Sequence, residues 1–131
     1  MMQTHTDNTL TQKDMINQAY KKLTAEELVA ILSNTTITGK YYYNNSWYKY
    51  RVNSFSDGTM EGQNDTGTYD EGRGQVNDDG SMSTEWDGYW EDWTGVAYRV
   101  NNEVIFFDTT THKWKTTYTL IEYGELPTDA L

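Results

Sequence analysis

The sequence predicts a mainly β protein: an eight-stranded antiparallel up-and-down barrel that follows an N-terminal helical segment. Of its nineteen aromatic residues only Tyr20 precedes residue 41, and strands favour aromatic side chains. From Thr36 onward apolar and polar residues alternate in about eight short runs, which turn-forming residues separate. No connection is long enough for a parallel crossover, so successive runs are expected to pair antiparallel and to close into a barrel. A β-sandwich of two sheets is the alternative.

Residues 11–34 are predicted to form helices after a disordered tail at residues 1–10. Two sequences in this region, 11–14 and 24–27, have the form of a capping box, a Thr followed three positions later by an acidic residue. Apolar residues then recur at helical spacing: Met15, Ile16, Ala19, Tyr20 and Leu23 in the first helix, and Leu28, Ile31 and Leu32 in the second. The second helix is expected to plug one mouth of the barrel.

The barrel is predicted to occupy residues 35–124, before a C-terminal tail at residues 125–131. Hairpin turns are expected at residues 44–45, 57–58, 77–80 and 101–102, because Asn and Gly accept the positive φ angles that tight turns need. The last strand is expected to carry Trp114, Thr116, Tyr118 and Leu120 on one face. The side chains predicted to point into the barrel are Tyr48, Tyr50, Met60, Tyr69, Trp86, Tyr98, Phe106 and Tyr118.

The net charge of −10 comes from one part of the chain. Residues 57–92 contain eleven acidic residues and a single base, Arg73. Such a surface repels phosphate backbones and anionic membranes, so a nucleic-acid partner is not expected. Acidic side chains on solvated turns explain the charge most simply, and a cation site or a basic partner is the alternative. Membrane insertion is not expected either, because no run approaches the roughly 18 apolar residues of a spanning helix.

The absence of cysteine excludes disulfides and thiolate metal sites. The first fourteen residues lack the basic and apolar regions of a signal peptide. The location therefore stays open: cytoplasmic, or periplasmic or secreted if a leader has been removed.

Several short motifs share their order with a known family. They are LTAEELVAIL (23–32) followed by NTTITG (34–39), the DGTMEG hairpin (57–62), GRGQV (72–76), AYRV (97–100) and YTLIEYG (118–124). With the strands placed, residues 23–124 resemble the DUF995 family of short bacterial proteins of unknown function, which have calycin-like (lipocalin-like) small barrels. The resemblance implies an eight-stranded barrel and export, and no activity. This chain lacks the cysteine pair common in that family, and Gly74 stands where an aromatic residue is common.

No catalytic or cofactor motif is present. The two histidines, His5 and His112, are too few for a zinc site, and no serine lies in a nucleophile elbow. Glu85 and Asp87 flank Trp86, a spacing that acid–base chemistry or Ca²⁺ could use, but no EF-hand pattern surrounds them. The sequence therefore predicts a protein that is not an enzyme and that binds no metal or cofactor.

Four large rings within residues 86–93 form the most distinctive local feature. A single strand face does not need so many rings, so some are expected at a barrel mouth. The predicted function is a binding module for a small apolar or amphipathic ligand, or a glycan, in or at that mouth. A protein–protein or inhibitor-type contact through residues 85–93 is the alternative, and the oligomeric state is left open. The predicted ligand-binding residues are Trp86, Tyr89, Trp90, Trp93, Tyr48, Tyr50, Tyr98 and Tyr118.

Overall fold

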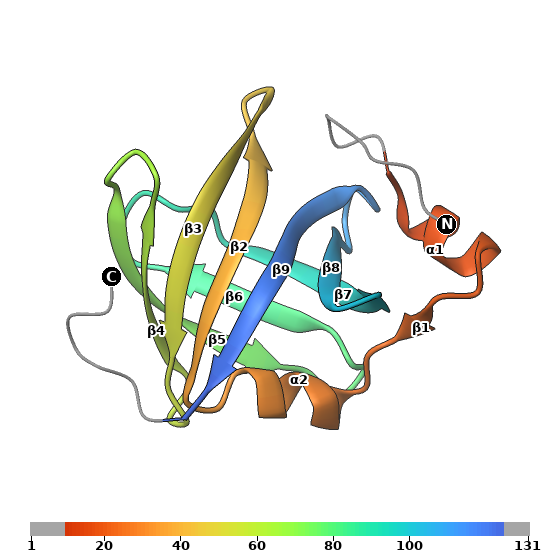
Figure 1. Ribbon diagram of the computed structural model, residues 1–131, viewed down its shortest axis with the longest axis horizontal. Coiled ribbons are helices and arrows are strands. Elements are labelled where there is room, and N and C mark those ends of the chain that lie inside the picture. Colours follow the sequence, from red (N-terminus) through yellow and green to blue (C-terminus); the bar gives the residue numbers. More distant parts are fainter. Residues whose placement is uncertain (1–9, 125–131) are drawn as a thin grey trace.

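The computed structural model describes residues 10–124, in which eight antiparallel strands form a closed barrel (Figure 1). Each strand pairs with its neighbours in sequence, and β2 pairs with β9 to close the ring. The strands are β2 (Thr35–Tyr43), β3 (Ser46–Ser54), β4 (Thr59–Asn64), β5 (Tyr69–Val76), β6 (Met82–Trp86), β7 (Trp93–Val100), β8 (Glu103–Asp108) and β9 (Trp114–Tyr123). The predicted up-and-down barrel is thus confirmed. The predicted tails, apart from Leu10, lie outside the described residues.

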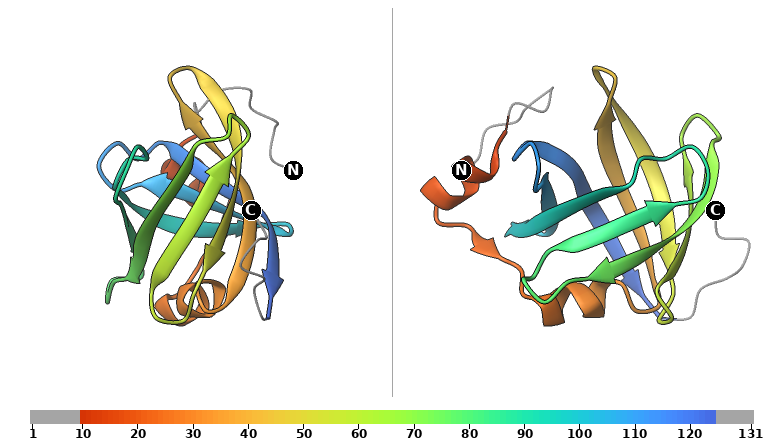
Figure 2. Two further views of the ribbon diagram at one scale, coloured as in Figure 1. Left: turned by 90° about the vertical axis from the view of Figure 1, so that its left-hand side faces the viewer. Right: turned by 180° about the vertical axis from the view of Figure 1, so that it is seen from behind.

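Helix α2 (Ala25–Ile31) closes one end of the barrel, as predicted (Figures 1 and 2). Thr24 caps it: its hydroxyl accepts from the Glu27 amide at 3.2 Å, and the Glu27 carboxylate accepts from the Thr24 amide at 3.0 Å. Leu28 and Ile31 are buried and join a core inside the barrel that includes Phe106. The opposite end of the barrel is not covered by α2. The turns after β2, β4, β6 and β8 lie at that end.

The N-terminal segment departs from the prediction of a long first helix. Helix α1 (Gln12–Asn17) ends early, Ala19 has a positive φ of 59°, and the short strand β1 (Lys21–Lys22) pairs with β7. Strand β6 pairs with β7 at only three positions, so the later half of β7 has a free edge. Strand β1 forms hydrogen bonds with that edge. Residues 21–22, which were predicted to be helical, therefore belong to the sheet.

A second core lies outside the barrel, where α1 covers β7 and β8. It contains Leu10 and Met15 together with Tyr98 and Phe107. Strands β7 and β8 are therefore buried on both faces, which explains the continuous apolar run in β8. None of the helices within residues 10–124 has the length and apolar character to span a bilayer.

Two β-bulges rotate parts of β9. The β8–β9 register pairs Phe106 with Thr116 but Phe107 with Trp114, and the β2–β9 register skips Thr119. Trp114 consequently joins the outer core, and Leu120 is 53% exposed. The prediction that both share a face with Tyr118 is wrong, because each bulge changes which face the following residues occupy.

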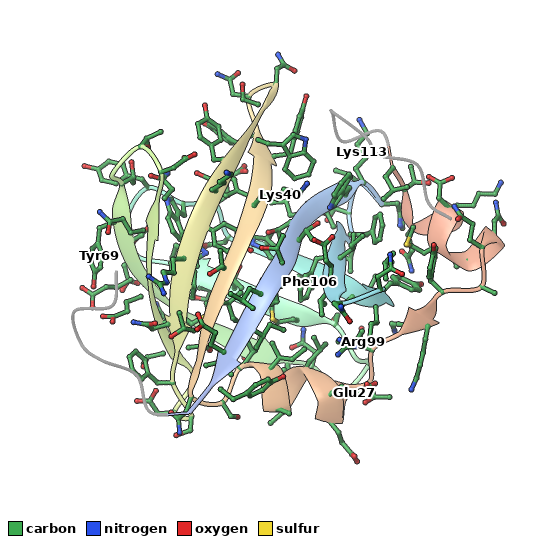
Figure 3. All side chains as sticks on the ribbon, in the orientation of Figure 1. Glu27, Lys40, Tyr69, Arg99, Phe106 and Lys113 are labelled. Carbon is green, nitrogen blue, oxygen red and sulfur yellow. The ribbon has the colours of Figure 1, made fainter. Side chains whose placement is uncertain are left out.

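Two other residues that were predicted to point inward, Tyr69 and Tyr98, do not. Tyr69 points away from the barrel and is 46% exposed, unlike Phe106, which lies in the interior as predicted (Figure 3). The inward position next to Tyr69 belongs to Asp70, which is buried and hydrogen-bonded. Tyr98 lies in the outer core, where its hydroxyl accepts from Gln12 at 3.1 Å. Alternation identified these strands correctly but could not tell which face is the inner one.

Candidate functional site

The open end of the barrel contains a cavity of about 450 Å³. Its lining includes residues in or next to the turns after β2, β4 and β6. These turns lie at the end of the barrel opposite α2 (Figure 2). Nine of its eighteen lining residues are aromatic. Val52 and Met60 add apolar surface, and threonine and asparagine side chains supply polar groups. The cavity thus combines apolar walls with a few hydrogen-bonding groups, as small-molecule sites do.

One wall is a group of tyrosine rings on β2 and β3. Tyr41 and Tyr48 face each other across the two strands, and their rings stack with centroids 5.5 Å apart and planes 25° apart. Tyr50, two residues further along β3, lies 5.7 Å from Tyr41. These three inward positions follow from the period of two along each strand.

The opposite wall comes from β6 and from the β6–β7 loop, residues 87–92. Two carboxylates fold this loop. The buried Asp70 accepts from the Gly88 and Trp90 amides, both at 2.9 Å, and from the Glu71 amide at 2.8 Å. Asp92 accepts from the Trp86 amide at 2.7 Å. These two acids therefore act as loop anchors, and the hydrogen bonds fix the direction in which Trp90 enters the barrel.

The ring of Trp90 extends across the open end. Its centroid lies 4.7 Å from that of Trp86 in an edge-on arrangement, 6.2 Å from Tyr41 and 6.4 Å from Tyr50. Gly62 on β4 permits this position, because a Cβ there would lie 2.6 Å from the Trp90 ring. Trp90 thus connects the loop wall with the tyrosine wall.

Two residues that line the cavity each have a buried polar atom without a hydrogen-bond partner. These atoms are the Thr84 hydroxyl oxygen and the Trp90 indole nitrogen, the only such side-chain atoms within residues 10–124. Thr84 is 4% exposed and lies on β6 between Met82 and Trp86. Buried polar groups without a partner are rare and costly, so each requires an explanation.

The remaining hydroxyls of the cavity differ in their partners. Tyr50 shares a hydrogen bond of 2.6 Å with Thr116, which donates to the Lys40 carbonyl at 2.7 Å. Tyr118 has only the Met82 sulfur, at 4.0 Å, as a hydrogen-bond acceptor. Burial raises the pKa of both the Tyr50 and Tyr118 hydroxyls well above the usual value, because desolvation disfavours the phenolate. Both are therefore neutral donors at physiological pH.

The charges of the cavity lining form one ion pair at its mouth. The Lys115 ammonium lies 2.9 Å from the Glu91 carboxylate, and their side chains are 19% and 57% exposed. The first bulge of β9 turns Lys115 toward the mouth, although its neighbour Trp114 lies outside the barrel. Lys40 on β2 lies against the rings of Trp47 and Trp114, 5.2 and 5.4 Å from their centroids.

No group of acidic or histidine side chains within residues 10–124 has the arrangement of a metal site. The pair that the sequence singled out is separated: Glu85 is exposed, and Asp87 forms a surface ion pair with Arg73 at 2.9 Å. His112 is exposed in the β8–β9 turn, and His5 lies outside the described residues. These side chains do not converge on the cavity.

Of the predicted ligand-binding residues, the structure brings seven together around the cavity: Trp86, Tyr89, Trp90, Trp93, Tyr48, Tyr50 and Tyr118. Tyr98 does not belong to this group, because it faces the outer core. Tyr41, Thr84 and Lys115 were missed. The first two occupy the inward phase of their strands, which could have identified them, whereas Lys115 depends on the bulge.

We compared the chain with protein families, curated proteins and solved structures. No family model, curated protein or solved structure matches it.

Proposed function

We propose that this protein is a binding module that holds a small amphipathic ligand inside the open end of its barrel. The single observation that carries the proposal is the cavity of about 450 Å³, whose lining residues are half aromatic and include two, Thr84 and Trp90, with a buried polar atom that lacks a partner. Its volume falls in the range of about 300–1,000 Å³ of small-molecule pockets. An eight-stranded barrel has room for side chains or for one small ligand. Here the core cluster that includes Leu28 and Ile31 packs inside the barrel against α2, and the cavity lies at the open end.

The alternative, a protein contact through residues 85–93, receives less support from the ring positions. Trp86, Trp90 and Trp93 line the cavity, and of the rings within residues 85–93 only Tyr89, at 87% exposure, stands free. One free ring offers a partner little area, because binding hot spots are clusters of buried aromatic anchors. A glycan, which also binds by ring stacking and hydrogen bonds, is the second candidate occupant of the same cavity.

We also propose kinship with the DUF995 family, which rests on the motifs in residues 23–124 and on the eight-stranded barrel. The two hairpin motifs, at residues 57–62 and 72–76, occupy β4 and β5 and the turn before β4. This kinship would favour export from a bacterial cell. It would add no activity, so the ligand proposal rests on the cavity alone.

The proposal is tested with N-phenyl-1-naphthylamine, an uncharged probe whose fluorescence rises in apolar sites, and in parallel with a panel of oligosaccharides. We expect saturable binding of the naphthylamine, and about tenfold weaker binding by Trp90→Ala, because the variant removes a ring that joins both walls. Tyr69→Ala is the matched control: it removes an outward-facing ring and should leave the affinity unchanged.

Thermal unfolding of both variants checks that they fold. Absence of binding by the unmodified protein to every probe would refute the proposal. Equal affinities for Trp90→Ala and Tyr69→Ala would place the binding site elsewhere. Binding of an oligosaccharide but not of the naphthylamine would replace the amphipathic ligand with a glycan.

A further inference from the structure

We infer that the ligand of the cavity is an uncharged, planar aromatic molecule whose carbonyl-type oxygen accepts hydrogen bonds from the Trp90 indole and the Thr84 hydroxyl. This inference rests on the proposed function and adds the chemistry that the site would recognise. Three independent features of the cavity lead to it: its unpaired donors, its charges and its ring walls.

The polar group of the ligand must be an acceptor. An indole N–H can only donate a hydrogen bond. The buried Trp90 nitrogen therefore requires a hydrogen-bond acceptor, such as an oxygen. The Thr84 hydroxyl, 4% exposed, can donate as well. Tyr118 supplies a third O–H, whose present acceptor is a sulfur at 4.0 Å. A carbonyl oxygen has two lone pairs and no hydrogen to donate, so it suits a site whose unpaired groups are donors.

The ligand is uncharged because no unpaired charge lines the cavity. Lys115 and Glu91 neutralise each other at 2.9 Å, and both lie at the mouth. Deeper in the cavity the walls are Val52, Met60 and aromatic rings, where a charged group would lose its hydration without gaining a counter-ion. The net charge of −10 opposes the entry of an anion in particular.

The ligand is planar and aromatic because the walls consist of rings. Tyr41 and Tyr48 stack on each other, Trp86 and Trp90 meet edge-on, and all four rings line the cavity. Aromatic pairs favour offset-stacked and edge-on arrangements, which a flat ligand can adopt against these surfaces.

The test uses three naphthalene probes of similar size. Prodan (6-propionyl-2-dimethylaminonaphthalene) is uncharged and has a carbonyl acceptor, N-phenyl-1-naphthylamine is uncharged and lacks one, and 1-anilinonaphthalene-8-sulfonate is an anion. We expect prodan to bind most tightly and the sulfonate most weakly. The prodan emission reports hydrogen bonding at its carbonyl.

Two variants remove one donor each: Thr84→Val keeps the side-chain shape, and Trp90→Phe keeps an aromatic ring of smaller area. Each should weaken prodan binding about three- to tenfold, and Thr84→Val should shift the emission of bound prodan to the blue. Thr84→Val should change the affinity for N-phenyl-1-naphthylamine less than twofold, and Trp90→Phe should weaken it less than it weakens that for prodan. Thr84→Ser, which restores a hydroxyl, should recover the prodan affinity.

The outcomes separate this inference from the proposed function. If no probe binds, the binding function itself fails. If the naphthylamine binds but prodan binds no better, or if both variants affect the two probes equally, the inference fails and the binding function stands. Tighter binding of the sulfonate than of prodan would also overturn it.

Discussion

Two buried threonines on the cavity wall differ in what their hydroxyls contact. Thr116, 3% exposed, bonds to Tyr50 at 2.6 Å and to the Lys40 carbonyl at 2.7 Å. Thr84, 4% exposed, has no partner. Satisfied buried hydroxyls contribute to stability, whereas unsatisfied ones reduce it. If the role of the Thr84 hydroxyl is to bind a ligand, removing this hydroxyl should make the ligand-free protein more stable.

The first prediction follows from this difference. Thr84→Val should raise the free energy of unfolding of the ligand-free protein by about 0.5–1 kcal/mol, because valine keeps the shape and removes the unpaired hydroxyl. The matched substitution Thr116→Val should lower it by about 1–2 kcal/mol, because two hydrogen bonds are lost. Urea denaturation measures both. Equal destabilisation by the two substitutions would mean that the Thr84 hydroxyl has a partner in solution.

At the scale of elements, the β6–β7 loop takes one of its two anchoring carboxylates from another element. Asp70 reaches the amides of Gly88 and Trp90 from the neighbouring strand β5. The other anchor, Asp92, lies in the loop itself. The position of Trp90, and with it one wall of the cavity, therefore depends on a residue outside the loop.

The second prediction tests this anchor. Asp70→Asn should lower the free energy of unfolding by about 2 kcal/mol, because one acceptor oxygen becomes an NH₂ group that faces an amide N–H. It should also increase the quenching of tryptophan fluorescence by acrylamide, as Trp90 leaves its position. Asp87→Asn is the control on the same loop: its ion pair is exposed, so a loss below about 0.5 kcal/mol is expected. An unchanged quenching curve for Asp70→Asn would contradict the anchoring role.

The strands and turns could be predicted from the sequence because each depends on local features. Asn44 and Asn45 have φ angles of 50° and 67°, as the predicted tight turn requires. The face of each strand was harder to predict, because it depends on partners far along the chain. Tyr98 faces outward and is nevertheless buried, because α1 covers β7.

The site was predictable in its rings and not in its polar groups. Seven of eight predicted residues line the cavity because large aromatic side chains in alternating strands tend to gather inside a barrel. Thr84 is one of many threonines, and only the three-dimensional structure shows that its hydroxyl lacks a partner. The position of Lys115 could not be predicted either, because bulges leave no clear signal in one sequence.

At the scale of the whole molecule, the closed sheet couples the buried tyrosines to global unfolding. The pKa values of Tyr50 and Tyr118 are raised in the barrel by desolvation, whereas in the unfolded chain tyrosine ionises near its ordinary pKa of about 10. Above that pH the unfolded state loses protons that the folded state retains. The free energy of unfolding must then fall as pH rises.

The third prediction concerns this alkaline limit. Stability should be insensitive to these two groups below about pH 10 and should decrease steadily above it. Tyr118→Phe should reduce the steepness of the decrease, because one of the two groups no longer ionises on unfolding. The matched control, Tyr89→Phe at an exposed ring, should leave the steepness unchanged. Denaturant titrations at pH 9, 10 and 11 provide the comparison, and identical slopes for both variants would contradict it.

The way the barrel closes has a consequence for how its specificity could evolve. Thr35 pairs with Tyr123, and the Gly124 amide donates to the Asn34 carbonyl at 3.0 Å, so the first and last strands join at the plugged end. No turn at the opposite rim takes part in that join. The rim around the cavity can therefore change in sequence while the closed sheet is kept. Changes at Thr66 and Thr68, which line the cavity in the β4–β5 turn, should alter which ligands are accepted without affecting the assembly of the barrel, by natural drift or in a designed library.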